Sequence, residues 1–460
     1  MRVMSRRNML AGTCALGACA SLNAPEGGEV APESGVAALL AARIDEQRRG
    51  SGGAIAVARN GAFSLASHGV TRLEGGAPID ADTTFQIASL TKIFTAFLLA
   101  DAVARGEVSL GEPVIRDAPQ LAYEGRAITC LDLATHTSGL PLRPVSRVDR
   151  SQENPYAGYS LQELRADIAA VRLERAPGAR FEYSNFGYAL LGWALAERAG
   201  RPYATLLEER ILRPLRMTST TLSPNAETRA RMVQGYNGDW TPMEPWDFGV
   251  LGPAGGLFST VADLQKFLAL WTEDHGRMST LARSMLTPLA PGADAETRMA
   301  LGWRVRTRNG RSIAWSNGSG GGVRSFMATS LDDRSGVIGF ANMATGIGVD
   351  DIGFRSLDPS EPVDVAPTPV RVAITVAPAV LRQYVGTYAH APDDTLSIVH
   401  AGDGLAIQQG GQLISLFAET ERRFFIREVN ATLEFSPAVN ELSPSFTLTQ
   451  QGQSFLYARQ

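Results

Sequence analysis

The chain has 460 residues, of which 44% are hydrophobic and 20% charged, and a formal net charge of −4; this is the composition of a water-soluble protein with two or three domains. The charge balance excludes the basic surface of a nucleic-acid-binding protein, and no apolar run reaches the 18 residues that predict a membrane span. Lys92 and Lys266 are the only lysines, so arginine supplies the other 41 of the 43 basic residues.

The first twenty residues are typical of an export signal. The sequence SRRNML at 5–10 resembles a twin-arginine signal, and an apolar stretch of small residues runs from 9 to 20. LGAC at 16–19 resembles a lipobox, in which Cys19 carries a lipid that tethers the protein to a membrane. The alternatives are cleavage after Ala20, which releases a soluble protein, and a cytosolic protein whose apolar start is accidental. We expect an exported protein with its signal at 1–20 and a Pro-, Gly- and Glu-rich tether at 21–34.

Cysteine and histidine provide no pattern for a metal site. Cys14 and Cys19 lie in the predicted signal, so Cys130 has no partner for an intramolecular disulfide and is expected to be a small buried side chain. The five histidines are scattered without an HExxH motif, and we expect no metal and no cofactor. A G-x-S-x-G motif is also absent, which argues against an α/β-hydrolase.

Beyond residue 34 the pattern predicts strands at both ends of one domain and helices between them. After a helix at 36–48, strands at 54–58 and 62–66 flank Asn60-Gly61, a two-residue hairpin signal. Strand-like segments return at 301–307, 312–315, 326–330 and 337–341. These distant strands predict one antiparallel sheet flanked by helices, with a helical insertion: an α/β (α+β) domain over 35–357. Helices are expected near 90–104, 129–135, 160–171, 186–199, 203–211 and 260–271.

The first helix of the insertion opens on Ser89-Leu90-Thr91-Lys92, whose spacing places Ser89 and Lys92 on one helical face. The run at 93–100 is apolar on nearly every side, as in a buried helix, and burial lowers the pKa of a lysine. A neutral Lys92 amine can take the proton of Ser89, whereas an arginine remains protonated. The alternative is an ordinary helix start with a solvated lysine. We favour the catalytic pair, with free N–H groups at the helix start available to an oxyanion.

Two later motifs carry further polar groups. Tyr183-Ser184-Asn185 precedes an amphipathic helix that closes at Gly200, and Tyr183 by itself is compatible with either a structural or a catalytic hydrogen bond. SNGSGGG at 316–322 follows a strand-like segment. These glycines form either a flexible turn or a strand edge that a substrate backbone can approach closely.

The C-terminal part differs in pattern from the rest of the chain. Five prolines lie within 358–380, which predicts a linker or an extended strap. From 381 to 460 short alternating runs are separated by turn residues, which predicts a small, barrel-like antiparallel β domain.

Taken in order, the three motifs resemble the serine β-lactamase and penicillin-binding-protein superfamily, closest to its class C and D-Ala-D-Ala carboxypeptidase-like branch. Four further segments are similar to this branch: FQIASLTK at 85–92, ITCLDLATHTSGLP at 128–141, PGARFEYSN at 177–185 and GGLFST at 255–260. The resemblance covers about residues 40–345, and the trailing β domain resembles accessory barrels of some members.

The resemblance implies a role for each polar residue. Ser89 would attack a carbonyl and become acylated, and Lys92 would activate it. Tyr183 would protonate the leaving amine and later activate water, while Asn185 would orient the substrate and Lys92. No metal is needed for this chemistry.

The third motif departs from the family pattern. Family members usually begin it with lysine or histidine, whereas this chain has Ser316, so the usual anchor for a substrate carboxylate is missing. The resemblance implies that Ser316, Gly318 and Ser319 contact substrate and that the N–H groups of Ser89 and Ser319 form the oxyanion hole. Arg324 is a candidate for the missing cation, against the simpler interpretation of a solvated arginine.

These expectations combine into an exported, periplasmic serine hydrolase that acts through an acyl-enzyme on a small-molecule or peptide substrate. Peptidoglycan-type D-amino-acid peptides or β-lactams are the expected substrates. The alternatives are a carboxylesterase for small esters and a catalytically silent peptidoglycan-binding protein, both on the same fold.

Overall fold

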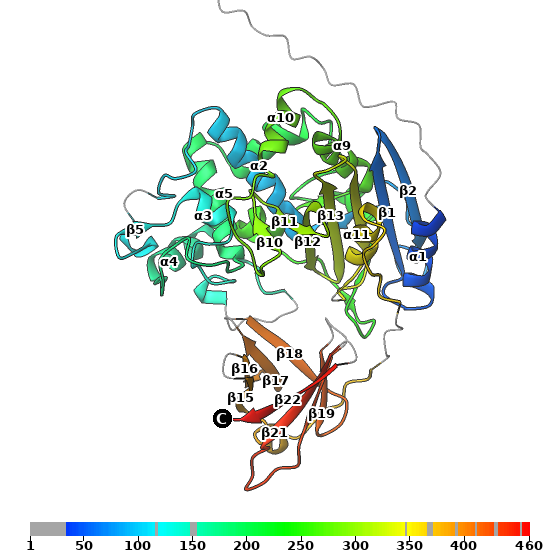
Figure 1. The fold of residues 1–460 in the computed structure, drawn as a ribbon, viewed down its shortest axis with the longest axis vertical. Coiled ribbons are helices and arrows are strands. Elements are labelled where there is room, and N and C mark those ends of the chain that lie inside the picture. The colour runs from blue at the N-terminus through cyan, green and yellow to red at the C-terminus, as the bar shows by residue number, and fades with distance from the viewer. Residues whose placement is uncertain are drawn as a thin grey trace, which may run out of the picture.

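The computed structural model describes residues 34–115, 118–147, 154–345, 347–365, 371–391, 394–409, 412–426, 431–450 and 453–460. The predicted signal with Cys19, and all of the predicted tether except its last residue, lie outside these ranges. Figure 1 shows two bodies, a large sheet covered by helices and a smaller all-β body joined to it by an extended segment.

The large body is built on an eight-stranded antiparallel sheet whose strands come from both ends of the domain. Its order is β2-β1-β14-β13-β12-β11-β10-β9, so β1 from the start of the domain pairs directly with β14 from its end. In Figure 1 the blue β1 and β2 accordingly lie beside the olive strands. The strands are β1 (Gly52–Arg59), β2 (Ala62–Gly69), β9 (Ala290–Pro291), β10 (Thr297–Met299), β11 (Arg304–Arg308), β12 (Arg311–Gly320), β13 (Val323–Ser330) and β14 (Gly336–Ala341).

Strand β1 explains why the sheet is covered on both faces. Its alternate alanines 54, 56 and 58 join the hydrophobic core on one side, whereas Ile55 and Val57 join a second core on the other side. The β1–β2 hairpin closes through Asn60 and Gly61 with φ of 52° and 75°, the positive angles of a type I′ turn. The predicted hairpin is therefore confirmed.

Helices form the two outer layers. On one face α1 (Ser34–Asp45) and α11 (Asp350–Leu357) pack over the core that contains Ile55. The other face carries the helical insertion between β2 and β9. Its helices are α2 (Thr91–Ala104), α3 (Cys130–Ala134), α4 (Leu161–Ala170), α5 (Asn185–Ala199), α6 (Tyr203–Leu207), α7 (Ala226–Ala230), α8 (Gly252–Gly255), α9 (Val261–Thr272) and α10 (Arg277–Ser284).

Helix α2 lies at the centre of the insertion, as its apolar composition predicts. Every residue from 91 to 102 is buried, and the helix ends before Gly106, whose φ is 71°. Cys130 is buried in the same core, and burial raises the pKa of its thiol to about 11. It is the small buried side chain that the sequence predicts.

Several predicted boundaries are wrong in instructive ways. The segment predicted as a strand at 312–315 continues to Gly320, so residues 316–320 belong to β12 and only Gly321 and Gly322 form the turn. The helix predicted at 203–211 is α-helical only to Leu207, and Glu208–Leu212 forms a π-helical turn. Glycines hide the strand period in the first case, and apolar spacing does not separate helix types in the second.

The smaller body is a closed barrel of eight antiparallel strands, as the alternating pattern predicts. It closes because β15 pairs with both β16 and β22. Aromatic rings fill its core, including the stacked pairs Tyr384–Phe435 and Phe446–Tyr457. The strands are β15 (Gly386–Ala391), β16 (Asp394–Ala401), β17 (Gly404–Gln409), β18 (Gln412–Ala418), β19 (Arg423–Ile426), β20 (Ala431–Phe435), β21 (Ser445–Gln450) and β22 (Gln453–Arg459).

The extended segment is fastened at both of its described ends. The backbone and side chain of Asp364 accept hydrogen bonds from Arg43 and Arg49 on the large body. On the barrel side, Arg371 pairs with Glu419 and the Ile374 N–H donates to the Ala418 carbonyl. The residues from 371 onward therefore lie against the barrel.

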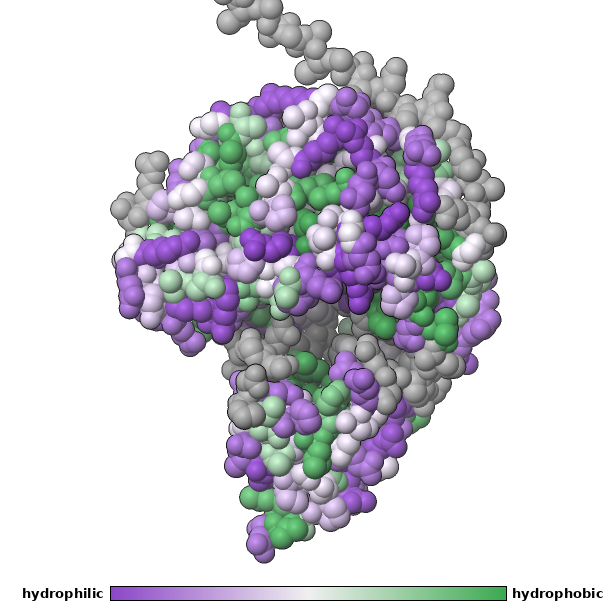
Figure 2. All heavy atoms as spheres, viewed as in Figure 1, coloured by the Kyte–Doolittle hydropathy of each residue, from purple (hydrophilic) through white to green (hydrophobic). Residues whose placement is uncertain are grey.

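The visible surface mixes polar and apolar residues over both bodies (Figure 2). Large exposed hydrophobic side chains include Leu289 on the large body and Leu456 on the barrel. Within the described ranges, no helix has the length and apolar character to cross a bilayer.

Candidate functional site

Ser89 lies in a tight turn between strand β3 (Phe85–Gln86) and helix α2. The turn is a 3₁₀ helix, Ala88–Leu90, in which Ala88 has the unusual φ of 44°. The surrounding structure holds the turn through Ile87, whose N–H donates to the Leu257 carbonyl and whose own carbonyl accepts from the Ser325 hydroxyl. As a result Ser89 is half-buried, while the residues on both sides of it are buried.

Lys92 is buried directly behind Ser89, with only 3% of its surface exposed. Its Nζ donates to Ser89 Oγ at 3.0 Å, to Asn185 Oδ1 at 2.8 Å and to the Ala254 carbonyl at 2.6 Å. Burial lowers the pKa of Lys92 well below its usual value, and the positive charge of Arg304 lowers it further. A neutral amine next to Ser89 is therefore accessible nearer to neutral pH than for a solvated lysine.

Tyr183 also contacts Ser89, because its hydroxyl donates to Ser89 Oγ at 2.7 Å. The residue stands just before α5, whose first turn is capped by the Ser184 hydroxyl accepting from the Gly187 N–H. Burial raises the pKa of the Tyr183 phenol, while the charge of Arg304 and the hydrogen bond to Ser89 oppose this rise.

Asn185 joins this group through both ends of its side-chain amide. Its Oδ1 accepts from Lys92, and its Nδ2 donates to the Tyr156 hydroxyl at 2.7 Å. The amide therefore fixes the Lys92 amine against the helical core. The structure thus brings together Ser89, Lys92, Tyr183 and Asn185, which the sequence motifs place up to 96 positions apart.

Strand β12 passes along the other side of Ser89. An added Cβ on Gly318 would lie 2.5 Å from the Ile87 carbonyl oxygen and 2.8 Å from the Ser89 nitrogen, so the close approach requires glycine. Ser316 is 5% exposed, whereas Ser319 is exposed. The pairing of β12 with β11 ends at Trp315, while its pairing with β13 continues to Gly320.

Arg324 is already engaged by a carboxylate of the protein. Its guanidinium lies 2.9 Å from Asp350 Oδ2, which also accepts from the Asn317 amide at 2.6 Å. This pairing disfavours Arg324 as an anchor for a substrate carboxylate, because Asp350 already neutralises its charge.

Three residues near the site carry no recognisable motif of their own. Tyr156 holds Asn185, and the ring of His136 lies 4.3 Å from the Tyr183 ring while its Nδ1 accepts from the Ser184 N–H. The guanidinium of Arg304 lies 5.6 Å from the centroid of the Tyr183 ring. Of these three, His136 alone lies in a segment noted for its family resemblance, 128–141. Tyr156 and Arg304 come close to the site only through tertiary contacts.

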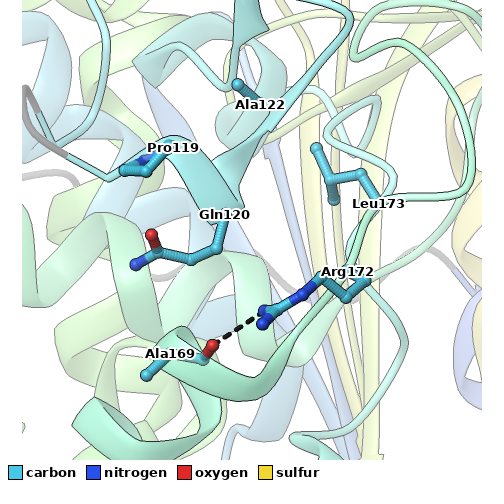
Figure 3. Close-up of a pocket in the computed structure, with 6 residues that line it drawn as sticks. All are labelled: Pro119, Gln120, Ala122, Ala169, Arg172 and Leu173. Carbon is cyan, nitrogen blue, oxygen red and sulfur yellow. Dashed lines mark hydrogen bonds between the residues drawn. The ribbon is translucent and has the colours of Figure 1, made fainter.

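A separate surface cavity of about 450 Å³ contains none of these groups (Figure 3). Arg172 is one of its lining residues and donates to the Ala169 carbonyl at 2.8 Å. The remaining lining residues are apolar or neutral, and the six offer no nucleophile. They are Pro119, Gln120, Ala122, Ala169, Arg172 and Leu173.

The described residues also contain no group of three His, Cys, Asp or Glu side chains arranged to hold a metal ion. The polar groups at Ser89 are a hydroxyl, an amine, a phenol and an amide. Such a set supports proton transfer and nucleophilic attack with no need of a metal ligand.

The sequence of the large body matches a known protein family. Residues 36–357 match the sequence profile of the Beta-lactamase family. The chain belongs to the β-lactamase family. Residues 370–455 match a second profile, described as a domain of unknown function, DUF3471.

Two relatives of this β-lactamase-family protein are named as carboxypeptidases. The chain is 32% identical over 312 residues to the D-alanyl-D-alanine-carboxypeptidase/endopeptidase AmpH of Escherichia coli, covering 61% of this chain and 79% of AmpH. The crystal structure of D-alanine carboxypeptidase AmpC from Burkholderia cenocepacia is similar with a TM-score of 0.61 at 25% identity, over 71% of this chain and 98% of that one.

One solved structure extends the similarity over nearly the whole chain. The octameric penicillin-binding protein homologue from Pyrococcus abyssi matches with a TM-score of 0.62, over 92% of this chain and 99% of that one, at 21% identity. At that identity the match concerns the fold. Together these findings make the chain a hydrolase of the β-lactamase and penicillin-binding-protein superfamily, with a small molecule or a peptide as its class of substrate.

Proposed function

We propose that the protein is a serine hydrolase in which Ser89 is acylated by the substrate. One observation carries this proposal: Ser89 Oγ lies 3.0 Å from Lys92 Nζ and 2.7 Å from the Tyr183 hydroxyl, within hydrogen-bond reach of both. A nucleophile that contacts two proton-transfer groups is the arrangement that nucleophilic catalysis requires.

The partners of Lys92 support its role as the group that activates Ser89. Two of its hydrogen bonds go to oxygens that only accept, Asn185 Oδ1 and the Ala254 carbonyl. When Lys92 is neutral, its two N–H groups satisfy these oxygens and its lone pair is left to face Ser89 Oγ. The amine then takes the proton as Oγ forms its bond to the substrate carbonyl carbon.

Tyr183 is proposed as the group that serves the leaving atom. After Ser89 gives up its proton, the bond between the carbonyl carbon and the leaving nitrogen or oxygen breaks, and the phenol supplies a proton to the departing group. The same phenol, deprotonated by that step, then takes a proton from a water whose oxygen bonds to the acyl carbon. The bond from that carbon to Ser89 Oγ breaks, and the proton held by Lys92 returns to Oγ, so the enzyme is restored. The N–H groups of Ser89 and Ser319 are proposed to bind the oxyanion, a contribution worth about 3–4 kcal/mol per donor in other enzymes.

The proposed substrates are D-amino-acid peptides of the peptidoglycan type or β-lactams. The names of the relatives support this class, because AmpH and the Burkholderia protein are both called carboxypeptidases. The edge of β12 that loses β11 after Trp315 offers backbone groups to an extended substrate. Asn185 and the strand residues Ser316, Gly318 and Ser319 are the proposed substrate contacts.

Small esters form the second candidate class, and the uncharged Ser316 is the observation that favours it. Without a cation at position 316, a substrate that carries no carboxylate loses nothing on binding. The catalytic group at Ser89 is equally suited to an ester carbonyl.

Export is proposed from the N-terminal pattern alone. Cys19 would then carry the lipid that tethers the protein to a membrane, and cleavage after Ala20 would give a soluble periplasmic form. Metabolic labelling with a radioactive fatty acid distinguishes the two forms: label in the wild type and none in Cys19→Ala supports the tether, and an unlabelled exported protein supports cleavage after Ala20.

The decisive experiment is intact-mass spectrometry of the protein after reaction with penicillin G, a D-Ala-D-Ala peptide, p-nitrophenyl acetate and a fluorophosphonate. We expect a covalent adduct on Ser89 with at least one of these acylating compounds and none in Ser89→Ala. A wild-type protein that forms no adduct with any of them would instead be the catalytically silent binding protein. Turnover of nitrocefin, peptide and ester then separates a lactamase, a carboxypeptidase and an esterase.

A further inference from the structure

The positive charge of Arg304, on strand β11 beside the Gly-rich strand β12, lies near Tyr183. Arg304 is the first residue of β11 and pairs with Trp315, at the point where β12 loses β11 as its neighbour. The guanidinium lies 4.8 Å from the centroid of the Trp315 ring and 5.6 Å from that of the Tyr183 ring. Lys92 Nζ lies 4.8 Å from the same Tyr183 ring. Tyr183 therefore lies close to both the Arg304 guanidinium and the Lys92 amine.

Neighbouring positions do not bring a comparable charge to Tyr183. Position 316 of β12 is a serine, and the guanidinium of Arg324 on β13 lies against Asp350. Arg306, on the same face of β11 as Arg304, pairs with Glu361 at 2.6 Å and packs on Phe354.

We propose that Arg304 is a positioning residue for the Ser89 site, supplying from β11 the positive charge that position 316 lacks. Its charge favours the neutral form of Lys92 and the deprotonated form of Tyr183, the two forms that accept protons in the reaction. This inference rests on the proposed acylation of Ser89 and extends it to a residue outside the three motifs.

The electrostatics of the site agree with this geometry. Burial lowers the pKa of Lys92, and Arg304 lowers it further; burial raises the pKa of Tyr183, and Arg304 opposes that rise. Burial lowers the pKa of Arg304 itself, but Tyr183 and Asp350 oppose this shift. An arginine remains protonated in proteins, so its charge is permanent at working pH.

Other ionisable groups face the same pair and must be included. Burial lowers the pKa of His136, so the ring beside Tyr183 is neutral near pH 7. Burial also raises the pKa values of Tyr188, which lies under Lys92, and of Tyr156, which holds Asn185 and has Arg143 near its ring. Both phenols therefore remain protonated and neutral, and Arg304 is the cation whose charge acts on Tyr183.

The test is the pH dependence of acylation in the full-length protein, measured with p-nitrophenyl acetate because this ester has no carboxylate. Removing the Arg304 charge raises the pKa of Lys92, whose neutral form is the one that acylation uses. The acidic limb of the profile in Arg304→Gln should therefore move upward by about one to two pH units, the effect of a nearby unit charge in a protein. Below the limb the rate should fall about 10- to 100-fold, and the high-pH plateau should be kept. Arg304→Lys should restore the limb.

Arg306→Gln is the matched control, because it removes an arginine from the same face of the same strand and should leave the limb in place. An unmoved limb in Arg304→Gln, an equal fall in rate at every pH, or an equal shift in Arg306→Gln would overturn the proposal. So would an unmoved limb together with a raised KM for penicillins alone, which would make Arg304 a substrate anchor.

If Arg304→Gln does not fold, Trp315→Leu is the second variant, because it removes the ring that holds the guanidinium. The acidic limb of Trp315→Leu should shift in the same direction, and an unshifted limb there overturns the proposal. Failure of the wild type itself to form an adduct on Ser89 would count against the proposed function instead.

Discussion

The two sides of the site differ in how their polar groups are satisfied. On the helical side, defined by Ser89, Lys92, Tyr183 and Asn185, each side chain is held by at least one of the others. On the strand side, residues 316–320 of β12, the Asn317 side chain turns to Asp350 and position 316 carries no charge. The helical side thus holds every side chain that the proposed acylation uses, whereas the departure from the family pattern lies on the strand side, at Ser316.

The largest effect should come from Ser89→Ala, which removes the nucleophile from the helical side. Acylation by any substrate should fall by about 10⁴-fold or more, because the groups around a nucleophile act as a unit. Intact-mass spectrometry after incubation with penicillin or fluorophosphonate measures this loss. An adduct formed by the variant at the wild-type rate would place the nucleophile elsewhere.

Lys92→Arg should lower turnover by about 10³-fold although it keeps the positive charge, because arginine does not give up its proton. The wild-type rate should rise with pH through the lowered pKa of Lys92, since the amine accepts a proton only when it is neutral. The chain offers a matched control in its only other lysine: Lys266 pairs with Asp263 on α9, and Lys266→Arg should keep full activity. Turnover of Lys92→Arg within tenfold of wild type would contradict the proton-acceptor role.

Tyr183→Phe should slow turnover by about 10²-fold, since it removes one hydroxyl from Ser89 and leaves the ring in place. Tyr203→Phe serves as its control, because Tyr203 is also half-buried against α2 and its hydroxyl lies 2.7 Å from Thr95 Oγ1. Steady-state rates with a penicillin and an ester compare the two. Equal rates for the two variants would reduce Tyr183 to a packing residue.

Ser316→Lys tests the strand side. Position 316 pairs with Met327, whose side chain belongs to the core on the helical face of the sheet, so a lysine there would point toward the same side as Lys92. Acylation by penicillins should improve about tenfold through a charge-assisted hydrogen bond to their carboxylate, while the rate with p-nitrophenyl acetate should stay the same. Equal changes for both substrates would mean that the absent charge does not limit recognition.

The smallest effect on acylation should come from deleting residues 366–460. The barrel has a hydrophobic core of its own, which shares no residue with the cores of the large body. We expect cooperative melting and a rate with p-nitrophenyl acetate within about threefold of wild type. An insoluble fragment, or a large loss of rate, would mean that the barrel completes the large body or its site.

The sequence predicts the helical side better than the strand side for a physical reason. Ser89 lies in the 3₁₀ turn that leads directly into α2, and Lys92 lies three residues later in the first turn of α2, so local geometry alone brings them together. Arg304 lies near Tyr183, from which it is more than 100 residues away along the chain. Tyr156 contacts Asn185, 29 residues later. No local sequence pattern predicts contacts over such separations. The neutralisation of Arg324 by Asp350 is likewise a property of the folded sheet.

The unusual turn at Ala88 has a consequence for evolution of the protein in the laboratory. A non-glycine residue at φ of 44° costs about 1–2 kcal/mol, a sum that the contacts of Ile87 must offset. A selection for heat resistance alone should therefore accept glycine at position 88, where the strain would relax and Ser89 would gain freedom to move. A selection that also demands turnover should reject that change. The residue recovered at position 88 therefore distinguishes selection for heat resistance alone from selection for heat resistance together with catalysis.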